Sequence, residues 1–209
     1  WNEALDLPPA LTEEEVVDAA RSHAEKNKVN TSLIGVGYYN THTPAVIKRN
    51  VLENPAWYTA YTPYQPEISQ GRLEALINFQ TMIEDLTGLP VAGASLLDEP
   101  TAVAEAITLS IRKGKNGARA ILVDQDTHPQ TLAVLNTRAN PLGIEIRMWD
   151  ANEPIPAGDF AGVVVSYPGS SGEIKNLSPI IEGIKSIGAM AIVTTDLLAL
   201  TLIESPGAL

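Results

Sequence analysis

The chain has 209 residues, 44% hydrophobic and 19% charged, which is enough to bury a core as one globular domain and excludes a disordered or fibrous chain. With 25 acidic and 14 basic residues the net charge is −11, and this charge repels nucleic-acid phosphates and anionic lipid headgroups. The absence of cysteine excludes disulfides, thiolate nucleophiles and zinc–thiolate sites.

Two helices are predicted in the first quarter of the chain. A capping box of Thr12 and Glu15 predicts an exposed helix that ends near Lys28, so residues 1–30 are interpreted as a helical appendage. A Thr–Pro pair predicts a second, short helix over residues 44–54, which ends because proline follows. The residues of this helix that are expected to point inward are Val46 and Ile47.

Residues 57–72 gather three of the six tyrosines with amide, carboxylate and guanidinium groups. A tyrosine ring favours burial while its hydroxyl needs a partner, so such a cluster is typical of a pocket wall or an interface, with chance clustering in a loop as the alternative. Ser69 begins the strongest helix, Gly88 ends it, and the helical spacing of its apolar residues predicts one buried face. Residues 31–88 are therefore interpreted as a tyrosine-rich interface segment followed by a long helix. The tyrosine-rich stretch itself is predicted to be a loop. The three tyrosines are Tyr58, Tyr61 and Tyr64.

From residue 89 onward, apolar runs of strand length alternate with helical patterns, which predicts an α/β fold with a mostly parallel sheet. The chain ends soon after the last strand without a closing helix, so residues 89–209 are interpreted as a partial α/β domain, incomplete at the C-terminus. The expected strands are a run up to residue 97, then 120–123, 144–149, 162–165 and 189–194, and the expected helices are 100–113, one after Pro129 and one from Ser178.

Ligands of an open parallel sheet bind at the carboxyl ends of its strands, and three segments meet there. The helix start at residues 95–102 has free backbone amides for an anion, although Asp98 and Glu99 beside them disfavour one. His128 follows a strand, and a polar capping loop is its alternative interpretation. Asp196 ends a buried strand, where an ionised carboxylate needs a cation or several donors unless it only caps the next helix.

An acid, an imidazole and a helix N-terminus together are the arrangement that holds an aromatic, phosphate-bearing cofactor such as pyridoxal phosphate. That cofactor also needs a Schiff-base lysine, and no lysine follows Asp196 on a next strand, so no catalytic residue is assigned in this chain. Nucleotide-binding, protease and hydrolase signatures are absent, and residues 168–173 are interpreted as a turn that could alternatively approach a ligand. The seven lysines are Lys26, Lys28, Lys48, Lys113, Lys115, Lys175 and Lys185.

At several segments spread over nearly the whole chain, the sequence resembles glycine decarboxylase, the P-protein family of the glycine cleavage system. The block of tyrosines and helix is the most specific part of this resemblance. Pro100 and Gly93 depart from the residues usual in the family at their positions. The matching segments are residues 34–44, 49–50, 53–55, 57–82, 95–99, 128–131 and 196–200.

The resemblance implies a large domain of the fold-type-I, pyridoxal-phosphate-dependent transferase kind. It also implies decarboxylation of glycine on pyridoxal phosphate and transfer of the aminomethyl group to the lipoyl arm of the H-protein. The family has two homologous halves, and the second half carries the Schiff-base lysine. This chain resembles the first, N-terminal half in truncated form, so its expected partners are the lysine-bearing half, glycine and the lipoylated H-protein.

The resemblance also implies roles for individual residues. Thr101, His128 and Asp196 align with positions that hold the cofactor in the catalytic half, and they are candidates for a vestigial site in this half. The tyrosine block is expected to face the partner half, where Arg72 would pair with a carboxylate and Tyr58, Tyr61 and Tyr64 would orient it. A salt bridge of Arg72 within the chain, to Glu67 or Glu74, is the alternative.

Three hypotheses for the function follow. The chain is part of a glycine decarboxylase and inactive alone, or it is a purely structural half that dimerises and docks the lipoyl carrier without contacting glycine, or it is a stand-alone domain that binds a small ligand. An oligomer is expected, because the sheet edge and the interface are uncovered. Neither a membrane span nor a signal peptide is visible, which predicts the cytoplasm, or the mitochondrial matrix in a eukaryote.

Overall fold

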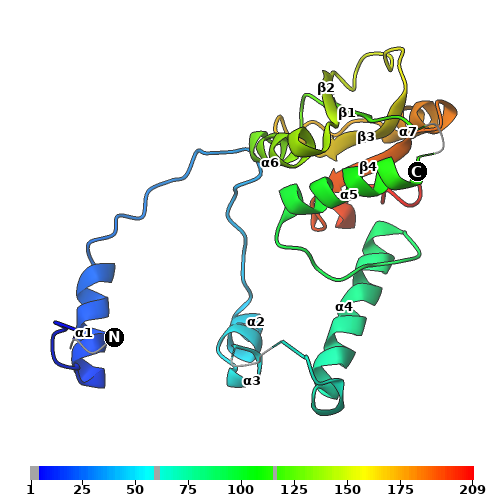
Figure 1. Cartoon of the computed structure of the whole chain (residues 1–209). Coiled ribbons are helices and arrows are strands. Elements are labelled where there is room, and N and C mark those ends of the chain that lie inside the picture. Colours follow the sequence, from blue (N-terminus) through cyan, green and yellow to red (C-terminus); the bar gives the residue numbers. More distant parts are fainter. Residues whose placement is uncertain (1–4, 59–61, 115–116) are drawn as a thin grey trace. The chain divides into compact units, whose positions relative to one another are not determined.

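The computed structural model describes residues 5–58, 62–114 and 117–209, and the chain divides into two compact units, residues 1–34 and 35–209. The smaller unit contains helix α1, Glu13–Ala24, on which no described residue is buried (Figure 1). The capping box is confirmed, since the backbone N–H of Thr12 donates to the Glu15 carboxylate and the Glu15 N–H donates to the Thr12 hydroxyl. The helix ends before Lys28, because the Asn27 side chain donates to the carbonyls of His23 and Ala24.

The larger unit begins with short helical pieces that differ from the prediction. Val46 and Ile47 were expected to point inward, but they are 57% and 49% exposed, because no described layer of the fold covers them. Trp57 and Tyr58 were expected in a loop and lie in a short helix instead. The pieces are α2 Ala45–Ile47, the π-helix η1 Lys48–Leu52, α3 Pro55–Tyr58 and the 3-10 helix η2 Pro66–Ile68.

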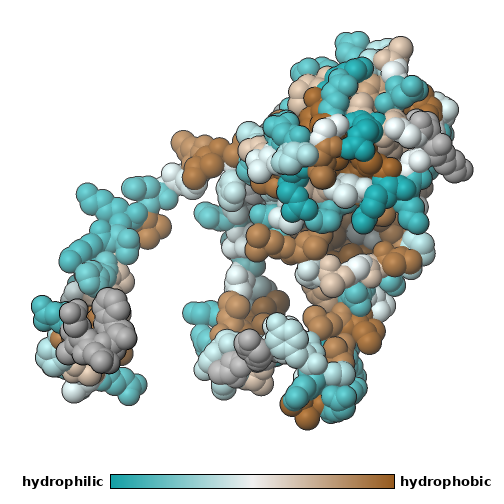
Figure 2. Space-filling model, viewed as in Figure 1, coloured by the Kyte–Doolittle hydropathy of each residue, from teal (hydrophilic) through white to brown (hydrophobic). Residues whose placement is uncertain are grey.

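Helix α4, Gln70–Thr87, ends at Gly88 as predicted. Gly88 adopts a left-handed conformation with φ 69°, which favours glycine, and its N–H donates to the Glu84 carbonyl. The predicted buried face is wrong, because no residue of α4 is buried, and Figure 2 shows apolar residues gathered over this helix. At the C-terminal end of α4, the Gly207 N–H donates a hydrogen bond to the Thr87 carbonyl. The exposed apolar residues of α4 are Leu76, Ile77, Phe79 and Met82.

The strand predicted up to residue 97 does not form. The backbone of Ala92 is paired with side chains of α4 instead of a neighbouring strand: its N–H donates to the Glu84 carboxylate at 3.0 Å, and its carbonyl accepts from the Gln80 amide at 3.2 Å. These side-chain partners satisfy the peptide groups that a sheet would otherwise have to pair. The apolar residues up to residue 97 are therefore irregular chain, tied to α4 at Ala92.

The remaining strands form a four-stranded sheet in the order β2-β1-β3-β4, and every neighbouring pair is parallel, which confirms the predicted α/β fold. Parallel strands need crossover connections, and helices supply the ones from β1 to β2 and from β3 to β4, whereas residues 150–159 join β2 to β3 as irregular chain. The β3 strand is buried over its whole length, as its continuous apolar run indicates. The strands are β1 Ala120–Asp124, β2 Glu145–Trp149, β3 Phe160–Tyr167 and β4 Met190–Thr195.

Helices cover both faces of the sheet (Figure 1). Because side chains alternate along a strand, Leu122 packs with α7 on one face, and Ile121 and Val123 pack with α5 and α6 on the other. Both faces are therefore closed by apolar layers. No helix among the described residues is long and apolar enough to cross a membrane. The later helices are α5 Glu99–Lys113, α6 Pro129–Ala139, η3 Asn140–Leu142, α7 Leu177–Ser186 and η4 Ala199–Thr201.

The strand order reverses between β1 and β3. The chain leaves β1 toward β2 on one side and then returns to place β3 on the other side of β1. At such a reversal the loops that follow the two strands diverge and leave a crevice at the carboxyl edge of the sheet, the usual ligand position in open α/β folds. The loop that contains His128 follows β1, and the loop of residues 168–172 follows β3.

Candidate functional site

A pocket of about 630 Å³ lies at this reversal and is called the switch-point pocket below. Its walls come from the loops after β1, β3 and β4, from the start of α5, and from a turn at residues 35–39. Of the predicted cofactor residues, His128 and Asp196 line the pocket, whereas Thr101 is not among its described lining residues. The fold thus brings together two of the three predicted positions.

His128 lies just before α6 and is half-buried. Its Nδ1 lies 2.9 Å from the Ser170 hydroxyl of the 168–172 loop, so the imidazole bridges the loops after β1 and β3. The other ring edge faces Gly37, where an added Cβ would lie 2.9 Å from Nε2. Both edges of the ring are therefore in contact with the protein.

Asp196 follows β4 and has a partner on each carboxylate oxygen. One oxygen accepts the Leu198 N–H at 3.0 Å, in a turn just before the 3-10 helix η4, whose N-cap residue is Leu198 and not Asp196. The other accepts the hydroxyl of Tyr39, a residue far away in the sequence. This hydrogen bond, with smaller effects of burial and of the carboxylate charge, raises the pKa of the Tyr39 hydroxyl. Tyr39 therefore stays protonated at neutral pH and donates to Asp196.

The start of α5 is capped by a carboxylate. Asp98 accepts the Thr101 N–H at 2.8 Å and also the Thr101 hydroxyl. The hydrogen bond from the hydroxyl, followed by the one from the N–H, lowers the pKa of Asp98, which keeps it ionised. Glu99 beside it accepts the Thr131 hydroxyl at 2.8 Å. A phosphate at this helix start would meet negative charge where it needs donors.

The turn at residues 35–39 forms the outer wall of the pocket. Three consecutive residues, Gly35, Val36 and Gly37, have positive φ values of 65°, 47° and 87°. Glycine adopts this region freely, whereas a β-branched valine there is a genuine outlier. The Tyr38 N–H closes the turn onto the Gly35 carbonyl at 2.9 Å, and the Gln130 amide of α6 donates to the Val36 carbonyl at 3.0 Å.

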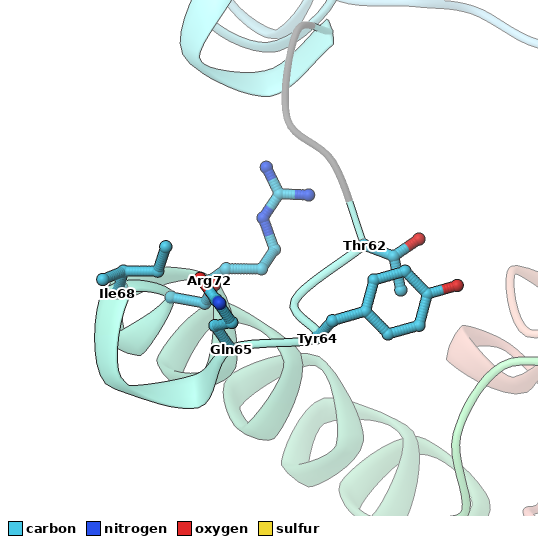
Figure 3. A pocket seen from close by; sticks show the side chains of 7 residues that line it. Thr62, Tyr64, Gln65, Ile68 and Arg72 are labelled. Atoms are coloured by element: carbon cyan, nitrogen blue, oxygen red, sulfur yellow. The ribbon is translucent and has the colours of Figure 1, made fainter.

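The predicted tyrosine and arginine residues lie elsewhere, around α3 and the start of α4. Tyr64 and Arg72 line a pocket of about 710 Å³, and Figure 3 shows the Arg72 guanidinium and the Tyr64 ring extending in different directions. Arg72 lies 5.6 Å from the centre of the Trp57 ring and donates to the Ala56 carbonyl at 3.5 Å. Tyr58 is 65% exposed on α3, and Tyr61 lies outside the described residues.

The salt bridge considered as an alternative for Arg72 is not found. Among the ion pairs of residues 5–58, 62–114 and 117–209, none joins Arg72 to Glu67 or Glu74. Arg72 is instead held by the aromatic face of Trp57 and by a backbone carbonyl.

The family model for the glycine cleavage system P-protein matches residues 1–209, the whole chain. The chain belongs to the P-protein family. It is 59% identical over 203 residues to a glycine dehydrogenase (decarboxylating) of Rhodopseudomonas palustris, and 59% identical over 205 residues to that of Bradyrhizobium diazoefficiens. These matches cover 97% and 98% of the chain but only 21% and 22% of the two relatives, so the chain spans about a fifth of their length.

A solved structure agrees with this assignment to the P-protein family. The fold superposes with a TM-score of 0.87 on a crystal structure of glycine decarboxylase (P-protein) of the glycine cleavage system in inhibitor-bound form. The sequences are 35% identical, and the match covers 99% of this chain and 48% of the other. The large-domain fold expected from the family resemblance is therefore confirmed.

Sequence reasoning missed the one buried cation among the described residues of this P-protein chain. The Lys175 side chain is 3% exposed, and its ammonium donates to Asp124 at 2.8 Å and to Asp126 at 3.2 Å. Burial alone would lower the pKa of Lys175, but the hydrogen bonds and charges of the two carboxylates outweigh it and raise the pKa. Two acids after a buried strand signalled the need for a cation, yet the lysine lies some fifty residues further on.

Asp126 also fixes the wall of the pocket. Its carboxylate accepts both the N–H and the hydroxyl of Ser171 at 2.8 Å, and its backbone carbonyl accepts the Ser170 N–H at 2.8 Å. Burial raises the pKa of Asp126, but the hydrogen bonds from Ser171, together with Lys175, outweigh burial and lower it. The loop packs so closely that a Cβ on Gly169 would lie 2.4 Å from the Asp126 carbonyl oxygen.

The pocket residues do not fit covalently bound pyridoxal phosphate. No lysine or arginine is among the described residues that line the pocket, so neither the Schiff base nor the phosphate charge finds a partner. Asp98 and Glu99 lie where the phosphate would bind, and Asp196 already accepts from Tyr39. Lys175, paired with two carboxylates, is held protonated and is not a nucleophile.

Proposed function

We propose that this chain is part of a glycine decarboxylase that acts with pyridoxal phosphate and passes the aminomethyl group of glycine to the lipoyl arm of the H-protein. The membership of the whole chain in the P-protein family supports this reaction. Within the enzyme, the chain is the half without the Schiff-base lysine and is inactive alone. Its partners are the lysine-bearing half, the H-protein and glycine.

The assignment of the cofactor chemistry to the partner half is supported by the contacts in the switch-point pocket. His128 and Asp196 occupy cofactor-type positions, but both contact groups of their own chain. Lys175, the one lysine that is buried among the described residues, is neutralised by Asp124 and Asp126. We infer that Thr101, His128 and Asp196 form a vestigial cofactor site, and that cofactor chemistry resides in the partner half.

Mixing the chain with pyridoxal phosphate, reducing with borohydride and measuring the intact mass tests this proposal. We expect only weak labelling spread over several lysines, because no lysine is among the described residues that line the switch-point pocket. The Lys175→Met variant should be labelled to the same extent as the parent chain. A stoichiometric adduct on one lysine, together with a Schiff-base absorbance band, would make this chain itself a cofactor enzyme.

The exposed apolar surface supports an interface role for the first part of the larger unit. Four apolar residues of α4 are exposed, and Val46 and Ile47 of α2 are exposed as well. We propose that a partner covers this surface in the assembled enzyme, that the chain is oligomeric, and that residues 31–88 are the segment that faces this partner. The tyrosine block would then face the glycine pocket of the partner half.

Alanine at Arg72 in the assembled enzyme separates a pocket role from a purely structural one. The guanidinium is held by Trp57 and a carbonyl, and no ion pair within residues 5–58, 62–114 and 117–209 gives it a carboxylate, so it is suited to pair with the carboxylate of glycine. We expect kcat/KM for glycine to fall by about 10- to 100-fold, the loss of one hydrogen-bonded charge pair. The exposed Arg112 on α5 provides the control variant Arg112→Ala.

The structural alternative rests on the same contact, because Arg72 already bridges α3 and α4. If the bridge is its whole role, Arg72→Ala will leave turnover of glycine unchanged in an enzyme of full stability. Thermal unfolding measured on both variants separates loss of activity from loss of structure. Unchanged kinetics with normal unfolding would leave the chain a scaffold that docks its partners without touching glycine.

A further inference from the structure

We propose that the turn at residues 35–39 is a built-in occupant of the switch-point pocket, taking the place of the cofactor that the homologous half would hold. This inference rests on the proposed function, in which this half does not carry the cofactor. It adds a reason why the pocket would not accept the cofactor: a segment of the same chain binds the residues that a cofactor would use.

Three contacts anchor the turn, and each involves a different part of the pocket. The Tyr39 hydroxyl donates to Asp196 after β4, and the Gln130 amide of α6 donates to the Val36 carbonyl at 3.0 Å. Gly37 lies against the His128 ring so closely that a Cβ there would be 2.9 Å from Nε2. The turn thus contacts both predicted cofactor residues that line the pocket.

The chemistry of the Tyr39 contact matches that of the missing cofactor. A pyridinium nitrogen would donate one hydrogen bond to the Asp196 carboxylate, and the phenol donates one hydrogen bond to the same carboxylate. The two donors compete for one acceptor. Asp98 likewise fills the helix start with its own carboxylate, so the phosphate end is closed by charge while the ring end is closed by Tyr39.

The backbone of the turn indicates that these contacts hold it in place. Val36 has φ 47°, a conformation that a β-branched residue keeps only when its surroundings fix it. Its carbonyl is the group that Gln130 binds, and glycines on both sides adopt left-handed conformations without cost. A segment that merely passed the pocket would have no reason to hold a strained valine at the point of contact.

Hydrogen exchange of the Tyr38 amide reports directly on the turn, because this N–H closes the turn onto the Gly35 carbonyl. In the 209-residue chain, Tyr39→Phe should speed exchange of this amide by about 10-fold or more, since a hydrogen bond to a charged acceptor is lost. Tyr38→Phe is the matched control, a neighbouring and equally exposed tyrosine whose hydroxyl does not contact Asp196. Equal exchange in Tyr39→Phe and the parent chain would overturn the inference.

A second variant tests the anchor at His128 without removing the phenol. Gly37→Ala places a methyl group against the ring and strains a residue with φ 87°, so it should also speed exchange of the Tyr38 amide. Gly93→Ala, where an added Cβ meets no atom within 4 Å, should leave it unchanged. No acceleration in Gly37→Ala would show that the turn does not rest on His128.

Binding of pyridoxine 5′-phosphate separates this inference from the proposed function, because this probe has no aldehyde and cannot form a Schiff base. The parent chain should show no saturable binding by calorimetry at millimolar probe. Saturable binding without faster exchange of the Tyr38 amide would overturn the built-in occupant, because the probe would then bind without displacing the turn. The assignment to the half without the Schiff-base lysine would still stand. A single-lysine adduct with pyridoxal phosphate would instead overturn the proposed function.

Discussion

Lys175→Met is expected to lower the free energy of unfolding of the chain by about 3–5 kcal/mol, the cost of leaving buried charges without their counter-ion. Asp124 is 1% exposed and would keep a carboxylate with no cation within reach. Urea denaturation followed by circular dichroism measures the change. Lys185→Met, at an exposed lysine of α7, is the control and should stay within about 0.5 kcal/mol of the parent chain. A midpoint for Lys175→Met equal to that of the control would contradict the role of the ion pairs.

The same ion pairs predict how stability depends on pH. Lys175 has a raised pKa, so its contribution is present below the unfolded value of about 10.4 and is lost as pH rises through the folded pKa. Asp126 has a lowered pKa, so its contribution is present above about 3.9 and is lost as pH falls through its folded pKa. At acid pH the difference in unfolding free energy between Lys175→Met and the parent chain should become smaller, because protonation of the carboxylates removes the charge that has lost its counter-ion.

Phe160→Ala is the second change expected to have a large effect, at about 3–5 kcal/mol of unfolding free energy. The Phe160 ring is 1% exposed at the start of β3, and the Arg147 guanidinium lies 5.2 Å from its centre. Removing the ring opens a cavity where the β3 strand, buried along its whole length, enters the sheet. Met148→Ala on β2 removes a 43% exposed side chain and should cost much less. Similar urea midpoints for the two variants would show that the site collapses around the lost ring.

The sheet and its helices were predictable because local pattern decided them. The continuous apolar runs became β1 and the fully buried β3, whereas β4, also expected to be buried, is a partly exposed strand at the sheet edge. Helices α6 and α7 supplied the crossovers from β1 to β2 and from β3 to β4. The ends of α4 and α1 followed from single residues, since Gly88 adopts the left-handed cap and Thr12 completes the capping box. Capping chemistry acts over three or four residues, so a sequence carries all of its information locally.

The predictions that were wrong or missing depend on contacts between separate segments of the chain. The strand predicted near residue 97 failed because Glu84 and Gln80, on a helix, bind the backbone of Ala92. The pairing of Lys175 with Asp124 and Asp126 joins segments about fifty residues apart, and no local pattern encodes it. Apolar periodicity showed that α4 has an apolar stripe, but it could not show whether any layer within this chain covers that stripe.

The candidate site was predicted in part for the same reason. His128 and Asp196 were found because strand ends of a parallel sheet converge, a rule that needs only the order of elements. Tyr39 and Gln130 were missed because their partners depend on where the turn at residues 35–39 lies in space. The left-handed valine at position 36 has no sequence signal other than the glycines beside it.

The buried apolar residues of the described chain all lie between Pro100 and Leu200. During synthesis the described residues before Pro100 are therefore made before the strands β1 to β4. Every strand pair must also wait for an intervening crossover helix, which slows folding of parallel sheets. The exposed helix α4 then remains open to chaperones or to unwanted association throughout that delay.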